Sequence, residues 1–185
     1  MYTMIQAGSM GVPFTSTLGY AGTDILERRP EDFKIIENPF DSQERTVVAK
    51  AMNPDVAIFH GLKGDRLGNV LVQKHGEELL LAQASRRVIV TVEEIVNSVD
   101  FEDSDGWFIP AIHVSAVVHA SLGAHPTGVP GLYDADEDRI NEYVKASGTD
   151  ESFGKYLNRY VFEVGSHQQY LELVGLRPEL EAVAR

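Results

Sequence analysis

The segment of residues 55–96 constrains the fold of this chain more than any other part of the sequence. It contains two runs of consecutive apolar residues, 56–59 and 88–90, each of strand length. Continuous apolar runs are typical of strands that are covered on both faces. Between them, residues 76–84 carry apolar side chains at the spacing of one helix face. The segment therefore predicts a strand, a Gly-Asp turn, a strand, a helix and a strand, which is an α/β arrangement.

Strand patterns continue to about residue 118, and helical patterns dominate after it. Strands are expected at residues 32–36, 46–50, 55–60, 69–73, 87–92 and 111–118. Helices are expected at residues 136–146, after a cap at Asp150 and after a cap at Ser166. We therefore expect an open, mostly parallel sheet flanked by helices, with a helical C-terminal extension over residues 134–185.

The opening residues have the pattern of a helix end and run directly into residues 11–26. No β-α unit precedes this stretch, although an α/β domain normally begins with one. We therefore expect a single domain over residues 1–185 that lacks the usual N-terminal β-α units.

Composition excludes several classes of function. The formal net charge is −12 with a pI near 4.8, and basic residues cluster only as the pairs Arg28–Arg29 and Arg86–Arg87. Nucleic-acid surfaces need clustered Lys and Arg, so nucleic acid and anionic membranes are not expected partners. There is no cysteine for a disulfide, a catalytic thiolate or a cysteine–zinc site. Without a membrane-length apolar run or a signal-peptide pattern, a cytoplasmic setting is expected.

Residues 64–69, Gly-Asp-Arg-Leu-Gly-Asn, form a turn signal between two expected strands. Gly68 and Asn69 tolerate positive φ, and the side chain of Asp65 can accept a hydrogen bond from the backbone two residues on. One interpretation is a tight connection between the strands. The other is the rim loop of a binding site, because sites in open α/β sheets lie at strand ends. Turn chemistry alone is compatible with both.

Glu93 and Glu94 follow an apolar strand, where paired carboxylates can act as acid, base or nucleophile. Adjacent strand residues point to opposite faces, however, so the two would not share one substrate. The alternative is one exposed glutamate and one in a salt bridge or subunit contact, since structural ion pairs resemble catalytic ones.

The histidines do not form a metal-binding pattern. His113 and His119 would lie about 20 Å apart on one strand, too far to share a metal ion, and no HExxH motif is present. His125 lies in a Gly/Pro-rich loop, where a hydrogen-bonding role competes with a functional one. We expect no metal. The chain also lacks phosphate-loop, dinucleotide and nucleophile-elbow motifs.

Residues 64–96, GDRLGNVLVQKHGEELLLAQASRRVIVTVEEIV, resemble the signature region of the first subunit of two-subunit CoA-transferases. In that family a GD-x-x-GN turn precedes a helix and a strand that ends in VEEIV. Residues 108–161 are similar to the closing part of the glutaconate CoA-transferase first subunit, with its proline-led strand, GAHP-type loop and tyrosine–aspartate pair. Residues 11–26, GVPFTSTLGYAGTDIL, fit the same subfamily, so the resemblance covers nearly all of the chain.

The resemblance implies a subunit of an acyl-CoA:carboxylate CoA-transferase, which transfers CoA between carboxylic acids through a glutamyl-CoA thioester. CoA thioester would be a substrate and not a covalently bound cofactor. The implied partners are the second subunit, an acyl-CoA and a carboxylic acid, in a hetero-oligomer. The nucleophilic glutamate of these enzymes belongs to the second subunit, so the catalytic residue is not expected in this chain. Residues at family motif positions would shape the fold, the subunit interface or the pocket wall; they are Asp65, Gly68, Asn69, Glu93, Glu94 and His125.

Two other functions stay open. The first is a subunit of a CoA-dependent hydrolase or ring-opening enzyme of the same fold. In such relatives a first-subunit glutamate upstream of the Val-Pro-Phe stretch is implicated, and this chain begins after it. The second is a non-catalytic ligand-binding or sensor domain, because related α/β folds also bind sugar phosphates in isomerases and regulators.

Overall fold

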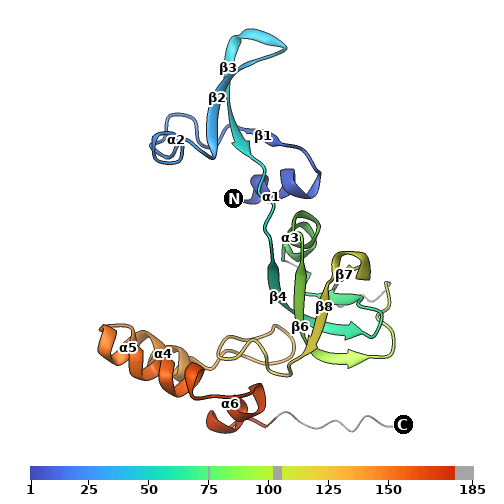
Figure 1. The fold of residues 1–185 in the computed structure, drawn as a ribbon, viewed down its shortest axis with the longest axis vertical. Coiled ribbons are helices and arrows are strands. Elements are labelled where there is room, and N and C mark those ends of the chain that lie inside the picture. Colours follow the sequence, from blue (N-terminus) through green and yellow to red (C-terminus); the bar gives the residue numbers. More distant parts are fainter. Residues whose placement is uncertain (75, 102–105, 178–185) are drawn as a thin grey trace. The chain divides into compact units, whose positions relative to one another are not determined.

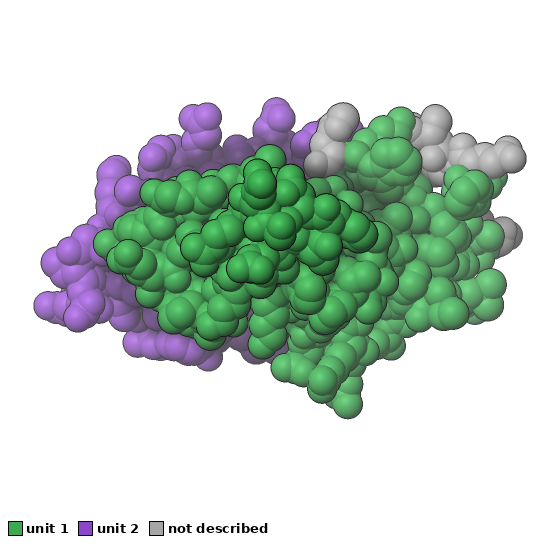
Figure 2. Space-filling view, turned by 90° about the horizontal axis from the view of Figure 1, so that it is seen from above, with its two compact units in different colours: residues 1–91, 95–118 green, residues 92–94, 119–185 purple. Residues whose placement is uncertain are grey.

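The computed structural model describes residues 1–74, 76–101 and 106–177, which form two compact units (Figure 2). Unit 1 contains Met1–Thr91 and Ile95–Val118, and unit 2 contains Val92–Glu94 and the chain from His119 onward. Strand β6 (Val88–Val96) therefore contributes residues to both units.

Unit 1 begins with a three-stranded antiparallel sheet in the order β1-β3-β2, in which β2 and β3 form a long hairpin (Figure 1). Its core contains Met4, Phe33, Val47 and Ala49. The strands predicted at residues 32–36 and 46–50 are confirmed. The second strand begins at Asp41, where it still pairs with β2. The sequence did not predict this start because residues 41–45 are polar and carry no strand pattern. The elements are α1 (Tyr2–Ser9), β1 (Phe14–Thr17), α2 (Ile25–Arg28), β2 (Phe33–Asn38) and β3 (Asp41–Lys50).

A five-stranded sheet in the order β7-β5-β4-β6-β8 belongs to unit 1 except for Val92–Glu94 and His119, which belong to unit 2. Strand β5 pairs antiparallel with both β4 and β7. Hydrogen bonds from Ala57 to Arg87 and between His60 and Thr91 advance in the same chain direction, as in parallel strands. The other strands and the helix are β4 (Ala57–Asp65), β5 (Val70–Val72), α3 (Glu78–Ala84), β7 (Trp107–Ile109) and β8 (Ala116–His119).

The α/β class is confirmed, and the sheet is mixed where a mostly parallel one was expected. The cause is the turn at residues 65–69, which is too short for a crossover and so joins β4 and β5 as an antiparallel hairpin. The helix predicted at residues 76–84 is confirmed as α3, which packs against α1.

The prediction of one continuous strand over residues 111–118 was wrong. A 3-10 turn, η1 (Ala111–His113), precedes β8. The backbone N–H of Ala111 donates to the Asn69 side chain, and the N–H of His113 donates back to the carbonyl of Pro110. These bonds use donors that a strand would need for its neighbour, so the chain bends before it enters the sheet.

Unit 2 carries the helices α4 (Glu137–Ala146), α5 (Asp150–Leu157) and α6 (His167–Leu173), with a π-helical turn η2 (Asn158–Phe162) after α5. Ser166 caps α6 as predicted, accepting from the N–H of Gln169. The predicted cap at Asp150 was wrong, because Thr149 accepts from the N–H of Ser152 and Asp150 is the first helical residue. Aromatic rings of α4, α5 and η2 pack together. Tyr143 contacts Phe153 and Tyr156 edge to face, Phe153 and Tyr156 are stacked, and the rings of Tyr156 and Tyr160 are tilted. In the described part of the chain, no helix combines the length and apolarity needed to cross a membrane.

Candidate functional site

The turn between β4 and β5 is organised around the buried carboxylate of Asp65, a residue that is only 3% exposed. One oxygen accepts from the backbone N–H groups of Leu67 and Asn69 at 2.9 and 3.0 Å. The other accepts from the Asn69 side-chain amide at 2.9 Å and from the N–H of Val99 at 3.1 Å. Gly68 closes the turn with a φ of +95°, a conformation that favours glycine.

The charge of Asp65 is directed into the protein, toward backbone and side-chain donors. Burial alone would raise the pKa of this carboxyl, but the hydrogen bonds from Asn69, Val99 and Leu67 stabilise the ionised form more and lower its pKa. The side-chain Oδ1 of Asn69 also accepts from the N–H of Ala111 at 3.0 Å, which ties the turn to η1. The structure thus brings Asp65, Gly68 and Asn69 together as a rigid strand connection.

Glu93 is the second organising carboxylate, and it lies in unit 2. One of its oxygens accepts from the backbone N–H of Leu122 at 2.6 Å, and the other accepts from the phenol of Tyr133. Its backbone carbonyl accepts from the hydroxyl of Ser121 at 3.0 Å. Glu94, by contrast, is exposed. The adjacent carboxylates therefore have different environments, and Glu93 binds the loop that follows β8.

Tyr133 connects Glu93 to the middle of this loop. Its phenol oxygen accepts from the N–H of Ala124 at 3.1 Å while it donates to Glu93. Burial raises the pKa of the Tyr133 phenol, and the hydrogen bond to the Glu93 carboxylate raises it further. The phenol therefore stays protonated as a permanent donor to Glu93 at neutral pH.

His125 holds the loop against the helices of unit 2. Its side chain is 4% exposed, with Nδ1 2.7 Å from the hydroxyl of Tyr170 and Nε2 3.2 Å from Oδ2 of Asp136. Asp136 is also the N-cap of α4. Its pKa is lowered mainly by the hydrogen bond from the backbone N–H of Arg139, and next by the hydrogen bond from His125. Burial raises the pKa of Tyr170 to about 12. Both imidazole nitrogens are thus engaged by side chains that fix the position of the ring.

The loop of residues 121–136 is held by several side-chain hydrogen bonds within unit 2. Leu122 has a φ of +58°, the sole positive φ found at a non-glycine residue within the described ranges. Such strain costs about 1–3 kcal/mol and concentrates at functional sites. Glu93 accepts from the N–H of this same residue, so the carboxylate holds the strained backbone in place.

Sequence reasoning identified Glu93 and His125 but not their partners. Tyr133 lies 40 residues from Glu93 and Tyr170 lies 45 residues from His125, beyond the range of any local pattern. Asp136 could have been found, because an aspartate directly before a helical pattern is an N-cap signal.

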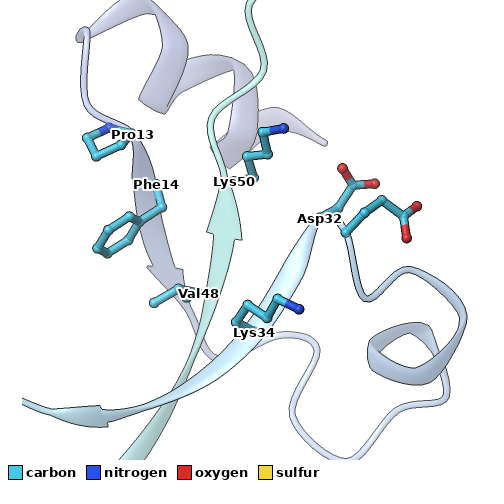
Figure 3. Close-up of a pocket in the computed structure, with 7 residues that line it drawn as sticks. Pro13, Phe14, Asp32, Lys34, Val48 and Lys50 are labelled. Atoms are coloured by element: carbon cyan, nitrogen blue, oxygen red, sulfur yellow. The ribbon is translucent and has the colours of Figure 1, made fainter.

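A shallow hollow of about 230 Å³ lies on the three-stranded sheet of unit 1 (Figure 3). It contains none of the residues singled out from the sequence. Its charges are mixed, because Lys34 and Lys50 face Glu31 and Asp32, and the two carboxylates are bound by Arg29. The volume is below the usual range for ligand pockets. Across the residues that the structure describes, no three His, Asp or Glu side chains are grouped to hold a metal ion.

The family model described as coenzyme A transferase matches residues 1–120. The chain belongs to the coenzyme A transferase family. The resemblance seen in the sequence is thereby confirmed, and the matched region contains the Asp65 turn and Glu93 but ends before His125.

Curated relatives extend the similarity to almost the whole chain. An uncharacterized protein of Archaeoglobus fulgidus is 37% identical over 97% of this chain and 40% of its own length. The A subunit of glutaconate CoA-transferase from Acidaminococcus fermentans is 32% identical over 95% of this chain and 60% of its own length. This family member thus spans 40–60% of the length of these relatives.

Solved structures give the same relationship in three dimensions. The crystal structure of glutaconate coenzyme A-transferase from Acidaminococcus fermentans matches 94% of this chain and 60% of that chain, with a TM-score of 0.85 and 32% identity. A variant of the decarboxylase AibA/AibB matches 85% of this chain and 58% of that chain, with a TM-score of 0.72 and 32% identity. Similar sequences on this fold therefore carry two different activities.

Proposed function

We propose that this chain acts in the first subunit of a two-subunit CoA-transferase, which moves CoA between carboxylic acids. The observation that carries the proposal is the similarity to the A subunit of glutaconate CoA-transferase, which extends over 95% of this chain. The agreement of the folds, with a TM-score of 0.85, supports the same assignment.

The proposed chemistry divides one difficult exchange into easier covalent steps. A glutamate carboxylate, which the second subunit contributes, attacks the thioester carbonyl of acyl-CoA, and the C–S bond breaks to give a mixed anhydride and CoA thiolate. The thiolate then attacks the glutamyl carbonyl, which releases the first carboxylic acid and leaves a glutamyl-CoA thioester. The acceptor carboxylate repeats both steps in reverse order, which regenerates the glutamate and gives the new acyl-CoA. CoA acts as a substrate in every step and not as a bound cofactor. We place this reaction in the cytoplasm.

In this proposal the residues of the present chain position the site and do not react. Glu93 uses both carboxylate oxygens to bind Tyr133 and Leu122, and His125 uses both nitrogens to bind Asp136 and Tyr170. A nucleophile or general base needs an oxygen or nitrogen directed at the substrate. We therefore assign the loop of residues 121–136 to the wall of the pocket, and the Asp65 turn to support of the sheet.

A product assay by mass spectrometry tests the proposal. The chain, purified together with its second subunit, is mixed with a panel of acyl-CoAs and excess acetate. We expect acetyl-CoA and the released carboxylic acid in equal amounts. Free CoA and acid without acetyl-CoA would instead establish a hydrolase, and saturable sugar-phosphate binding with no turnover would establish a sensor domain.

A decarboxylase is the second candidate, because AibA/AibB is as similar in sequence as the transferase is. The same assay separates the two. Decarboxylation gives an acyl-CoA that is lighter by one CO₂ and needs no acetate, whereas transfer requires the acceptor acid.

A further inference from the structure

The tip of the β2–β3 hairpin presents Phe40 with 97% of its surface exposed, the highest value among the described large apolar side chains. Residues 39–45 around it are all exposed as well. A phenylalanine ring that stays in water does not contribute the stabilisation that its burial would give. At this exposure the side chain adds almost nothing to the packing of unit 1.

The backbone that carries Phe40 is held in one shape by side chains on both sides of the tip. Asn38 Oδ1 accepts from the N–H of Phe40 at 2.9 Å, and Asn38 Nδ2 donates to Glu44 Oε2 at 2.6 Å. Asp41 accepts from the N–H of Gln43 at 3.0 Å. The ring of Pro39, the residue before Phe40, fixes its own backbone φ. The ring is thus presented by a preorganised turn, which lowers the entropic cost of binding.

The base of the hairpin is anchored in the core of unit 1. Phe33 on β2 and Val47 and Ala49 on β3 are buried, and the two strands pair along the length that Figure 1 shows. A rigid arm with a buried base and a single exposed aromatic at its tip has the form of a binding anchor, since aromatic residues are enriched at interfaces and hot spots lie in well-packed pockets.

We propose that this hairpin docks on the second subunit, with Phe40 seated in an apolar pocket that has a basic rim. The inference rests on the proposed function, because it names a contact of that two-subunit enzyme. The rim follows from charge: Glu37, Asp41 and Glu44 surround the tip, against Arg45 alone. A second copy of this chain, with its net charge of −12, would bring like charge to the tip. A partner surface with Lys and Arg around an apolar pocket complements it.

The test is the dissociation constant between this chain and its second subunit, measured by a titration that does not depend on turnover. Phe40→Ser is expected to weaken the complex at least about 30-fold, the size of effect typical of a hot spot. Leu18→Ser is the matched control, because Leu18 is 80% exposed in the same unit but lies off the hairpin, and it should leave the constant unchanged. Circular dichroism and the thermal midpoint should not change for either variant.

Charge reversal examines the rim separately. Glu37→Lys, which leaves the contacts of Asn38 and Asp41 at the tip in place, should slow association and reduce its dependence on salt. Wild-type affinity in Phe40→Ser would overturn the docking inference whatever the activity of the complex. Loss of self-association in Phe40→Ser, with unchanged affinity for the second subunit, would also overturn it. Failure of CoA transfer in a complex that Phe40→Ser still weakens would refute the proposed function and leave the docking surface standing.

Discussion

Single carboxylates organise both loops that the sequence singled out as candidate sites. Asp65 accepts from three different residues of unit 1, and Glu93 links a strand to a loop in unit 2. In each case the ionised oxygen atoms face backbone or side-chain donors of the same unit. Charge-assisted hydrogen bonds of this kind are stronger than neutral ones. Removal of the charge should therefore lower the free energy of unfolding more than it lowers catalytic activity.

Asp65→Asn should lower the free energy of unfolding by about 2–3 kcal/mol at pH 7. The new side-chain NH₂ group is a donor, and it would point at N–H groups that are themselves donors. The folded-state pKa of Asp65 is lowered, so its stabilisation is present above the unfolded pKa near 3.9 and is lost as pH falls through the folded pKa. The deficit should therefore shrink toward pH 3. Urea unfolding from pH 7 to pH 3, followed by tryptophan fluorescence, measures it.

Asp55→Asn is the control for this measurement, because the Asp55 carboxylate forms an exposed pair with Arg86. Exposed pairs contribute little, so the control should stay within about 0.5 kcal/mol of the wild type. A deficit in Asp65→Asn that is the same at pH 7 and pH 3 would contradict the role assigned to the charge.

Glu93 and Tyr133 should behave as one unit in a double-mutant cycle. Tyr133→Phe leaves a carboxylate oxygen of Glu93 without this donor and should cost about 1–3 kcal/mol, and Glu93→Gln should cost a similar amount. The double variant should cost clearly less than the sum, because the second change removes a bond that is already broken. Unfolding free energies give the coupling, and hydrogen exchange at Leu122 reports on the loop. Strict additivity would mean that the contact carries no energy.

Elements with a strong local pattern could be predicted from the sequence, and elements set by distant contacts could not. The apolar run at residues 88–90 gave β6, and the turn chemistry of residues 64–69 gave the β4–β5 connection. The break before β8 depends on Asn69, which lies 42 residues from the backbone group that it binds. The hydrogen-bond partners of Glu93 and His125 are similarly remote, so the sequence singled out these two residues as candidates but could not predict their bonds.

The start of α5 offers a direct test of one corrected element. Thr149 accepts the capping bond, whereas Asp150 contributes only its charge near the helix N-terminus. Thr149→Ala should therefore destabilise unit 2 by about 1 kcal/mol, and Asp150→Asn by less than about 0.5 kcal/mol. Thermal unfolding followed by circular dichroism distinguishes them, and the reverse order of effects would restore the cap predicted from the sequence.

The whole molecule combines a strong negative charge with exposed apolar side chains, and these two properties have opposite effects on association. Ile58 on β4 is 68% exposed and Val118 on β8 is partly exposed, both in the five-stranded sheet. Exposed apolar groups on a sheet favour self-association, while a net charge of −12 opposes it at low salt.

We therefore expect that the isolated chain is not a clean monomer at high protein concentration, and that added salt increases its association by screening the repulsion. Light scattering over a concentration series at about 0.05 and 0.5 M NaCl measures the weight-average mass; the Debye length falls below about 10 Å over this range. Ile58→Glu should reduce the association by placing a charge on the exposed sheet, and Phe40→Ser should leave it largely unchanged because that side chain is assigned to a different partner. A monomer mass that is independent of concentration in both salts would show that the apolar side chains of the sheet do not drive contact between copies, even where the charge repulsion is screened.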